Sequence, residues 1–262
     1  MKIKLLTIFS LSLILITSCH SQVNMAESEK KPLETKNQNP EIQKFILDNP
    51  DDGEPSVSKG VVSNGTLLNG KLLPYSGSNF QYFADVSFLK GRAFVHSSVK
   101  KIVVDSYKIL ETKSSNHRFY LMESSNKCGG KLDPHKTHQN GTSIDFMMPL
   151  LKNNQEYIGL DTIGITHYLL NFDDRGRYSE DTLVKINFDL VALHLLELNK
   201  VAKKNGMKIG KVIIKLELKD ELFASIYGKE LLSNGIYFAQ KLTPLINGVH
   251  DEHYHVDFEF IK

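Results

Sequence analysis

This chain of 262 residues has few cysteines, almost no net charge and few long apolar runs. Its two cysteines are Cys19 and Cys128, and its formal net charge is +2. A chain so close to neutral lacks the positive field through which proteins attract nucleic acid or anionic lipid. Beyond the first residues, no apolar run approaches the roughly 20 residues of a transmembrane helix. These absences argue against a nucleic-acid-binding protein and against a membrane-spanning one.

The first 19 residues are predicted to be a targeting segment rather than part of the fold. Lys2 and Lys4 form a basic start, and the apolar run over residues 5–16 is too short to span a membrane as a mature helix. The sequence Ile-Thr-Ser before Cys19 resembles a bacterial lipobox, in which the cysteine is lipidated and becomes the mature N-terminus. We therefore expect an exported lipoprotein that faces the periplasm, anchored by Cys19 in the outer membrane. A plain signal peptide with a coincidental cysteine is the alternative.

Removal of this segment strengthens the argument against nucleic-acid binding and leaves one cysteine free of lipid. Without Lys2 and Lys4, 30 of the 32 basic residues remain against 30 acidic residues, so nucleic acid is not expected as a partner. With Cys19 lipidated, Cys128 has no partner for a disulfide within the chain. The stability of the mature protein must then come from core packing.

Residues 20–56 are predicted to be a flexible tether. They are rich in Asn, Gln, Glu, Lys and Pro and poor in large apolar residues. Such a composition cannot bury enough surface to offset the loss of chain entropy. At most, residues 42–47 form a short helix. Residues 57–262 are of a length that suits one globular domain.

Apolar spacing predicts the main elements of that domain. A helix is expected over 99–110, capped by Ser97 or Ser98, and another over 191–202, ended by Gly206. Strands are expected over 119–122, 144–148, 212–218 and at the C-terminus. Because strands and helices mix without a regular β-α-β alternation, we predict an α+β fold with a mostly antiparallel central sheet.

The C-terminal stretch contains the first chemical signal. Alternation predicts a strand with one face formed by Tyr254, Val256, Phe258 and Phe260 and the other by His253, His255, Asp257 and Glu259. Two histidines two residues apart on a strand lie roughly 6 to 7 Å apart. One imidazole can then bind a metal while the other reaches a water on that metal. A polar face turned to solvent explains the two acids well and the two histidines poorly.

A second group lies upstream. His138 and Asp145 are seven residues apart, so they are not helix neighbours, and Gly141 between them permits a sharp turn. On the strand that follows, Asp145 faces away from the core positions, toward the side to which His138 can fold back. With His255 these residues form two imidazoles and a carboxylate, which suit zinc. Three protein ligands leave one position for water and so indicate a catalytic centre.

The two stretches together resemble the LAS metallopeptidases, and more closely the penicillin-insensitive murein endopeptidases, over about residues 120–262. Those enzymes carry H-x-x-H-Q-x-G-x-x-x-D, then H-D-x-H-x-H near the C-terminus. The matching residues are His135, His138, Gln139, Gly141, Asp145, His250, Asp251, His253 and His255, with Gly129 and Gly130 ahead of them.

The resemblance implies zinc ligands His138, Asp145 and His255, with His253 as the catalytic base. His135 and His250 are then groups around the ligands that orient them or bind the tetrahedral oxyanion. The chain departs from these endopeptidases in having no tryptophan, none of their disulfides, and a predicted lipid anchor and tether. The departures concern the substrate pocket more than the chemistry.

The predicted function is a membrane-tethered zinc endopeptidase that hydrolyses amide bonds in peptidoglycan cross-links containing D-amino acids. A zinc D,D- or L,D-carboxypeptidase acting on the stem peptides is one alternative, because the ligands alone do not separate the two. The other alternative is a non-catalytic cell-envelope lipoprotein that uses zinc to hold its sheet. A structural site would not require His253.

Overall fold

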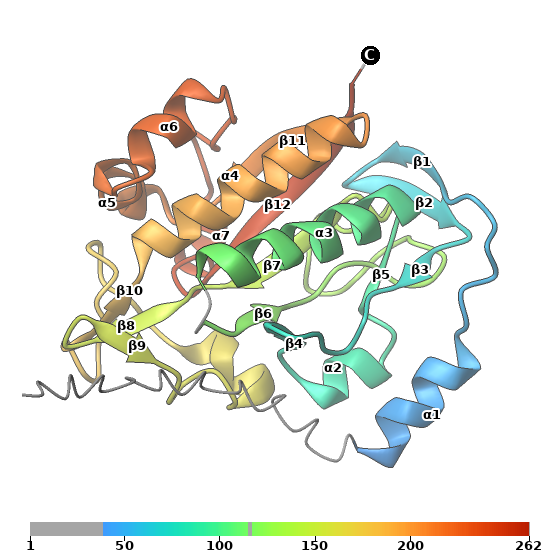
Figure 1. Cartoon of the computed structure of the whole chain (residues 1–262), viewed down its shortest axis with the longest axis horizontal. Helices are drawn as coiled ribbons and strands as arrows, with labels where there is room; N and C mark the ends of the chain where they lie inside the picture. Colours follow the sequence, from blue (N-terminus) through green and yellow to red (C-terminus); the bar gives the residue numbers. More distant parts are fainter. Residues whose placement is uncertain (1–38, 115–116, 262) are drawn as a thin grey trace, which may run out of the picture. The chain divides into compact units, whose positions relative to one another are not determined.

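The computed structural model describes residues 39–114 and 117–261. Cys19, the predicted targeting segment and the first part of the predicted tether lie outside these residues. The described helices are α1 (Pro40–Asp48), α2 (Asp85–Leu89), α3 (Ser97–Lys113), α4 (Phe188–Lys204), α5 (Lys219–Ala224), α6 (Gly228–Ser233) and α7 (Pro244–Gly248), with 3-10 helices η1 (Gly164–Leu169) and η2 (Leu216–Leu218) (Figure 1). The strands are β1 (Val57–Val61), β2 (Asn64–Leu68), β3 (Lys71–Leu72), β4 (Phe80–Tyr82), β5 (Phe94–Val95), β6 (Phe119–Leu121), β7 (Ser143–Met147), β8 (Leu150–Lys152), β9 (Gln155–Tyr157), β10 (Val184–Ile186), β11 (Met207–Ile213) and β12 (His253–Phe260).

The largest sheet has the strand order β11-β12-β7-β6-β4. Its pairs are antiparallel except for β4 and β6, which are parallel. Three smaller sheets have the orders β10-β8-β9, β1-β2 and β3-β5. The α+β class is therefore confirmed, with mixed pairing in the central sheet and antiparallel pairs in the majority.

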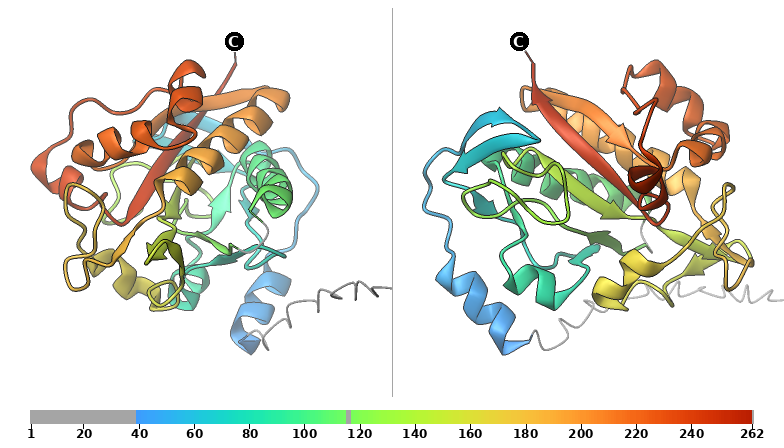
Figure 2. Two further views of the ribbon diagram at one scale, coloured as in Figure 1. Left: turned by 60° about the vertical axis from the view of Figure 1, so that its left-hand side comes forward. Right: turned by 180° about the vertical axis from the view of Figure 1, so that it is seen from behind.

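The predicted C-terminal strand is β12, which lies between β11 and β7 (Figure 2). Its apolar face is buried as predicted through Phe258, whereas Phe260 is 49% exposed at the strand's end. The opposite face is not turned to solvent: His253, His255 and Asp257 are 3%, 2% and 6% exposed. The strand predicted over 212–218 is β11, which ends at Ile213 and gives way to the 3-10 turn η2.

Two long helices cover one face of the central sheet. α3 and α4 lie side by side, and α4 packs against β11 (Figure 1). The predicted α3 is confirmed, but its N-cap is His96, whose Nδ1 accepts a hydrogen bond from Ser98 N at 3.1 Å. An imidazole nitrogen can accept from a free amide as a hydroxyl does, so the cap comes before both predicted serines. α4 ends at Lys204 with Asn205 as its C-cap, and Gly206, with φ +71°, follows directly, where the sequence predicts the end of the helix.

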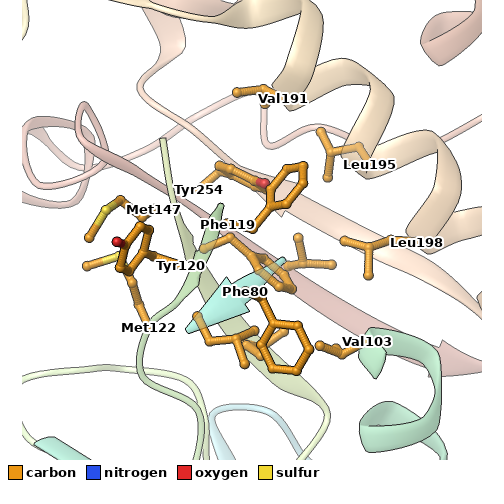
Figure 3. Close-up of a cluster of buried hydrophobic side chains, with 14 of the residues drawn as sticks. Phe80, Val103, Phe119, Tyr120, Met122, Met147, Val191, Leu195, Leu198 and Tyr254 are labelled. Carbon is orange, nitrogen blue, oxygen red and sulfur yellow. The ribbon is translucent and has the colours of Figure 1, made fainter. Parts of the chain in front are cut away.

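Apolar and aromatic side chains fill the space between these helices and the sheet (Figure 3). Val103 from α3 and Leu195 and Leu198 from α4 are fully buried. They belong to one buried cluster with strand residues such as Phe119 and Tyr254. The opposite face of β12 and β7 is therefore left for the histidines and carboxylates.

The structure differs from the predicted tether between residues 39 and 56. Ile42 in α1 is fully buried, and Phe45 packs edge-on against Phe88, with ring centroids 5.6 Å apart. Farther along, Asp51 and Asp52 pair with the buried Lys71. The packed part of the chain thus begins before residue 57. Residues 39–56 are mostly polar and contain one short helix. Their apolar residues are too few to form a periodic pattern from which this packing could be predicted.

Among the described residues, no helix combines the length and the apolar character needed to cross a membrane.

Candidate metal centre

Strand pairing brings the two predicted motifs together. In the register between β7 and β12, His255 stands directly opposite Asp145, and His255 Nδ1 lies 2.8 Å from Asp145 Oδ1. His138 Nε2 completes the group, 3.0 Å from His255 Nδ1 and 3.3 Å from Asp145 Oδ1. All three side chains are at most 2% exposed. The three predicted zinc ligands therefore converge on one buried point.

The loop before β7 delivers His138 by unusual backbone conformations. His138 itself has φ +67°, and Gly141 has φ +76°. A Cβ on Gly141 would lie 2.6 Å from Leu67 Cδ2, so glycine is required both by the backbone and by the close approach of β2. A hydrogen bond of 3.0 Å from Gln139 N to Val62 O ties the loop to the β1–β2 turn. The sharp turn predicted at Gly141 is confirmed.

These atoms fit a metal ion. Two atoms bound to a tetrahedral zinc at about 2.0 to 2.1 Å are roughly 3.3 Å apart. The three separations here run from 2.8 to 3.3 Å. The second oxygen, Asp145 Oδ2, is buried and has no hydrogen-bond partner among the described residues. A buried carboxylate oxygen without a donor is unusual and is explained by a cation beside it.

His135 belongs to the same cluster. Ligand atoms of His135, His138 and Asp145 lie within 4.8 Å of one another, so this group could hold a metal ion. His135 Nδ1 is 3.6 Å from Asp145 Oδ2. The structure therefore allows two sets of three ligands. Both contain His138 and Asp145, and the third ligand is either His255 or His135. The chain thus offers four candidate ligands where the sequence predicted three.

His253 lies beside this cluster and points at it with one ring nitrogen. His253 Nε2 is 3.9 Å from Asp145 Oδ2, while Nδ1 is 2.5 Å from Glu252 Oε2. Its ring centroid is 4.7 Å from that of His250. The structure therefore places the predicted catalytic base next to the predicted ligands, at a longer distance than they have from one another.

The two flanking histidines differ in their hydrogen bonds. His250 Nδ1 donates to Ile246 O at 2.6 Å, which leaves Nε2 as an acceptor in the neutral ring. His135 Nε2 is 2.8 Å from Glu123 Oε2, which also accepts from Arg92 Nη1 at 2.8 Å. Burial opposes charge on His135, but Glu123 and Asp145 raise its pKa above the ordinary value. The protonated ring can then donate a second hydrogen bond, from Nδ1, to an anionic oxygen.

Three of the imidazoles are backed by buried carboxylates that the sequence analysis did not assign to the site. Glu123 contacts His135, Glu252 contacts His253, and Asp257 Oδ1 lies 2.7 Å from His255 Nε2. Such carboxylates fix the ring orientation and the tautomer of metal-bound histidines. A signal for Asp257 was available, because it is two residues from His255 on the same strand face. Glu123 has no sequence signal, since it reaches the site through strand pairing, with Asp145 N donating to Glu123 O at 2.9 Å.

Burial and these charges determine the pKa values at the centre. Burial opposes charge on Asp145, but His138 and His255 hold its pKa well below the ordinary value. Burial likewise opposes charge on His255, yet Asp257 and Asp145 raise its pKa to about 10. Burial lowers the pKa of His253 to about 4 and raises that of Glu252 well above its ordinary value. Asp145 is therefore ionised, as a metal ligand must be, and His253 is neutral. His255 has to release its proton for a metal ion to bind at Nδ1, so metal binding there is coupled to proton loss.

The remaining residues singled out in the sequence have other positions. Asp251 accepts a hydrogen bond from Phe172 N at 2.9 Å and so attaches the segment after η1 to the start of β12. Cys128 is an exposed free thiol. Asp173 begins a turn, with Gly176 N donating to its carbonyl oxygen at 2.9 Å.

Neither protein-family models nor a search of curated proteins yields a match to this chain.

Proposed function

We propose that this protein is a zinc-dependent peptidase that hydrolyses amide bonds in the peptide cross-links of peptidoglycan. The observation that carries the proposal is the position of His253 beside a buried His-His-Asp group. A site that used metal only to hold the sheet would need the ligands and nothing more. Here a further imidazole, backed by its own carboxylate, directs a free nitrogen to the same point.

The residues divide the chemistry as follows. His138, Asp145 and His255 would hold the ion, and zinc bound there would polarise an amide carbonyl and make a water more acidic. In the reactive form, Glu252 is ionised and the ring proton of His253 lies on Nδ1. The Nε2 atom then takes a proton from the attacking water and later returns it to the leaving amine. Asp257 orients His255, and it is itself held by Ser143 Oγ at 2.6 Å and Lys211 Nζ at 2.8 Å.

The substrate follows from the motifs and from the N-terminus. The resemblance to murein endopeptidases favours a bond that involves D-amino acids, and lipidation at Cys19 would keep the enzyme beside the cell wall. A carboxypeptidase that trims stem peptides would use the same centre. The products distinguish the two, because an endopeptidase separates cross-linked stems whereas a carboxypeptidase releases a single terminal amino acid.

The test is digestion of purified cross-linked peptidoglycan with the zinc-loaded protein, followed by mass analysis of the fragments. We expect cross-linked dimers to be converted to monomers, and a chelator to abolish the reaction until zinc is restored. His253→Ala should slow hydrolysis on the order of 100-fold or more while retaining zinc, as expected for the loss of a positioned base.

His117→Gln is the matched control, since His117 is also buried beside a carboxylate but pairs with Glu156 outside the cluster. Its activity should stay close to that of the unaltered protein. Equal activity of His253→Ala and His117→Gln would show that His253 is not the base.

A further inference from the structure

A tyrosine that the sequence does not single out lies against the histidine cluster. Tyr168, in η1 (yellow in Figure 2), packs edge-on against His253, with ring centroids 5.4 Å apart and an interplanar angle of 90°. Its ring centroid is 6.4 Å from that of His135. On another side it packs against Phe83, at 5.5 Å. The ring therefore contacts both flanks of the candidate metal centre.

The hydroxyl of Tyr168 is buried and has no hydrogen-bond partner among the described residues. The charges that act on it most strongly are those of Asp145, Glu123 and Glu252, which are all carboxylates at or behind the centre. A buried hydroxyl without a partner is unfavourable by itself. At this position it is a donor that the protein itself does not use.

Two contacts fix Tyr168 relative to His253. The preceding residue, His167, is fully buried, and its Nε2 lies 3.3 Å from Glu252 O. Four residues after Tyr168, Phe172 N donates to Asp251 Oδ2 at 2.9 Å. Both contacts reach the two residues just before His253, so η1 and the start of β12 are held together on both sides of Tyr168. These contacts hold the side chain of Tyr168 in one position beside His253.

We propose that Tyr168 is a catalytic residue whose hydroxyl donates a hydrogen bond to the carbonyl oxygen of the scissile amide. The inference rests on the proposed hydrolysis. As the water oxygen bonds to the carbonyl carbon, its proton goes to His253 Nε2 and the carbonyl electron pair moves onto the carbonyl oxygen. Tyr168 stabilises that charge without transferring its proton. When the C–N bond breaks, the oxygen regains its double bond and His253 returns the proton to the amine nitrogen.

The experiment compares Tyr168→Phe with Tyr107→Phe in zinc-loaded protein. Tyr107 is a matched control, because its hydroxyl is also buried without a partner, and its ring contacts are Phe80, Phe119 and His194, away from the metal cluster. Each variant removes one unpaired oxygen, so both should fold and melt at or above the temperature of the unaltered protein. Both should bind one zinc per chain.

The readout other than activity is binding of inorganic phosphate, a tetrahedral anion, measured by calorimetry on the zinc-loaded protein. Tyr168→Phe should weaken phosphate binding about tenfold, as expected for one lost hydrogen bond to a charged group, and Tyr107→Phe should leave it unchanged. Hydrolysis of peptidoglycan cross-links by Tyr168→Phe should fall in kcat on the order of 100-fold with little change in KM.

The outcomes separate this inference from the proposed function. Undiminished phosphate affinity and turnover in Tyr168→Phe would overturn the role of Tyr168 while leaving the peptidase in place. Equal losses in both tyrosine variants, or loss of zinc in Tyr168→Phe, would also overturn it, since either result means a structural role. If the unaltered protein cleaves no peptidoglycan but loses phosphate affinity in Tyr168→Phe, Tyr168 is still a hydrogen-bond donor to an anion at this centre. The proposed substrate is then wrong.

Discussion

At the scale of single residues, the centre is distinguished by what stands behind each imidazole. Asp257 backs His255 and Glu123 backs His135, each at a hydrogen-bonding distance below 3 Å. Carboxylates in this position make an imidazole a better ligand and fix its tautomer. Because each acid serves one histidine, the two acids can be used to find out which histidine completes the ligand set.

We predict that Asp257→Asn weakens zinc binding about 10- to 100-fold, because His255 loses the carboxylate that orients it. Glu123→Gln should change zinc affinity little, since it backs a residue outside the proposed ligand set. Competition with a zinc indicator measures both. Glu259→Gln is the control on the same strand, since Glu259 pairs with Lys208 in solvent. The reverse order, with Glu123→Gln the weaker binder, would assign His135 as the third ligand.

At the scale of elements, β12 is buried on both faces and serves two purposes. Its residues His253 and His255 face the metal cluster, and Tyr254 between them faces α4, where its hydroxyl bonds to His194 Nδ1. The His194 ring also stacks on Tyr107 from α3, with centroids 5.1 Å apart. Two buried polar groups in an apolar layer are both satisfied only when they face each other. The bond between Tyr254 and His194 therefore helps to fix the position of β12 against α4.

The His194 contact predicts a pH dependence of stability. Burial lowers the pKa of His194 to about 3, against about 6.5 in the unfolded chain. The unfolded state therefore binds a proton below pH 6.5 that the folded state does not, and the stability contributed by His194 falls as pH falls from 6.5 toward 3. The stability difference between the unaltered protein and His194→Gln should shrink by about 2 kcal/mol between pH 7 and pH 5.

Urea unfolding at pH 7, 6 and 5 checks this. The other buried histidines are present in both proteins and cancel in the difference. Lys200→Gln, on the exposed side of the same helix, should show a difference that is independent of pH. A constant gap for His194→Gln would mean that folding leaves the pKa of His194 unchanged.

At the scale of the packed unit, the contacts begin before the predicted domain boundary. α1 buries Ile42 fully, and the residues after it cover Lys71, which is 4% exposed and paired with Asp51 at 2.9 Å. Ser56 Oγ in turn accepts a hydrogen bond from Ser97 N at the start of α3, at 3.0 Å. Residues 39–56 therefore contribute to the core instead of only connecting it to an anchor.

We expect Ile42→Ala to lower the free energy of unfolding by about 2 to 4 kcal/mol, because it leaves a cavity under α1. Leu47→Ala in the same helix should change it by less than about 0.5 kcal/mol, since Leu47 is 78% exposed. Denaturant unfolding of both variants measures the effect. If Ile42→Ala and Leu47→Ala had equally small effects, α1 would belong to the tether and would not contribute to the core.

The local features of this protein follow from short stretches of its sequence. The period of two from Tyr254 onward predicted β12, the helical spacing from Val99 predicted α3, and Gly141 predicted the turn that His138 needs. The residue types in the two motifs also indicated a metal centre. These features follow from properties of neighbouring residues, namely backbone conformation, side-chain periodicity and ligand chemistry.

Which residues come into contact depends on how the elements pack together. Asp145 and His255 are adjacent because of the register between β7 and β12, and Glu123 joins them because β6 continues alongside β7. The position of Tyr168 depends on η1, in a segment whose sequence has no clear period. The burial of the polar face of β12 and of Ile42 depends likewise on elements packed from elsewhere in the chain. Contacts across long sequence separations are set by the packing of whole elements, and no local pattern of residues encodes them.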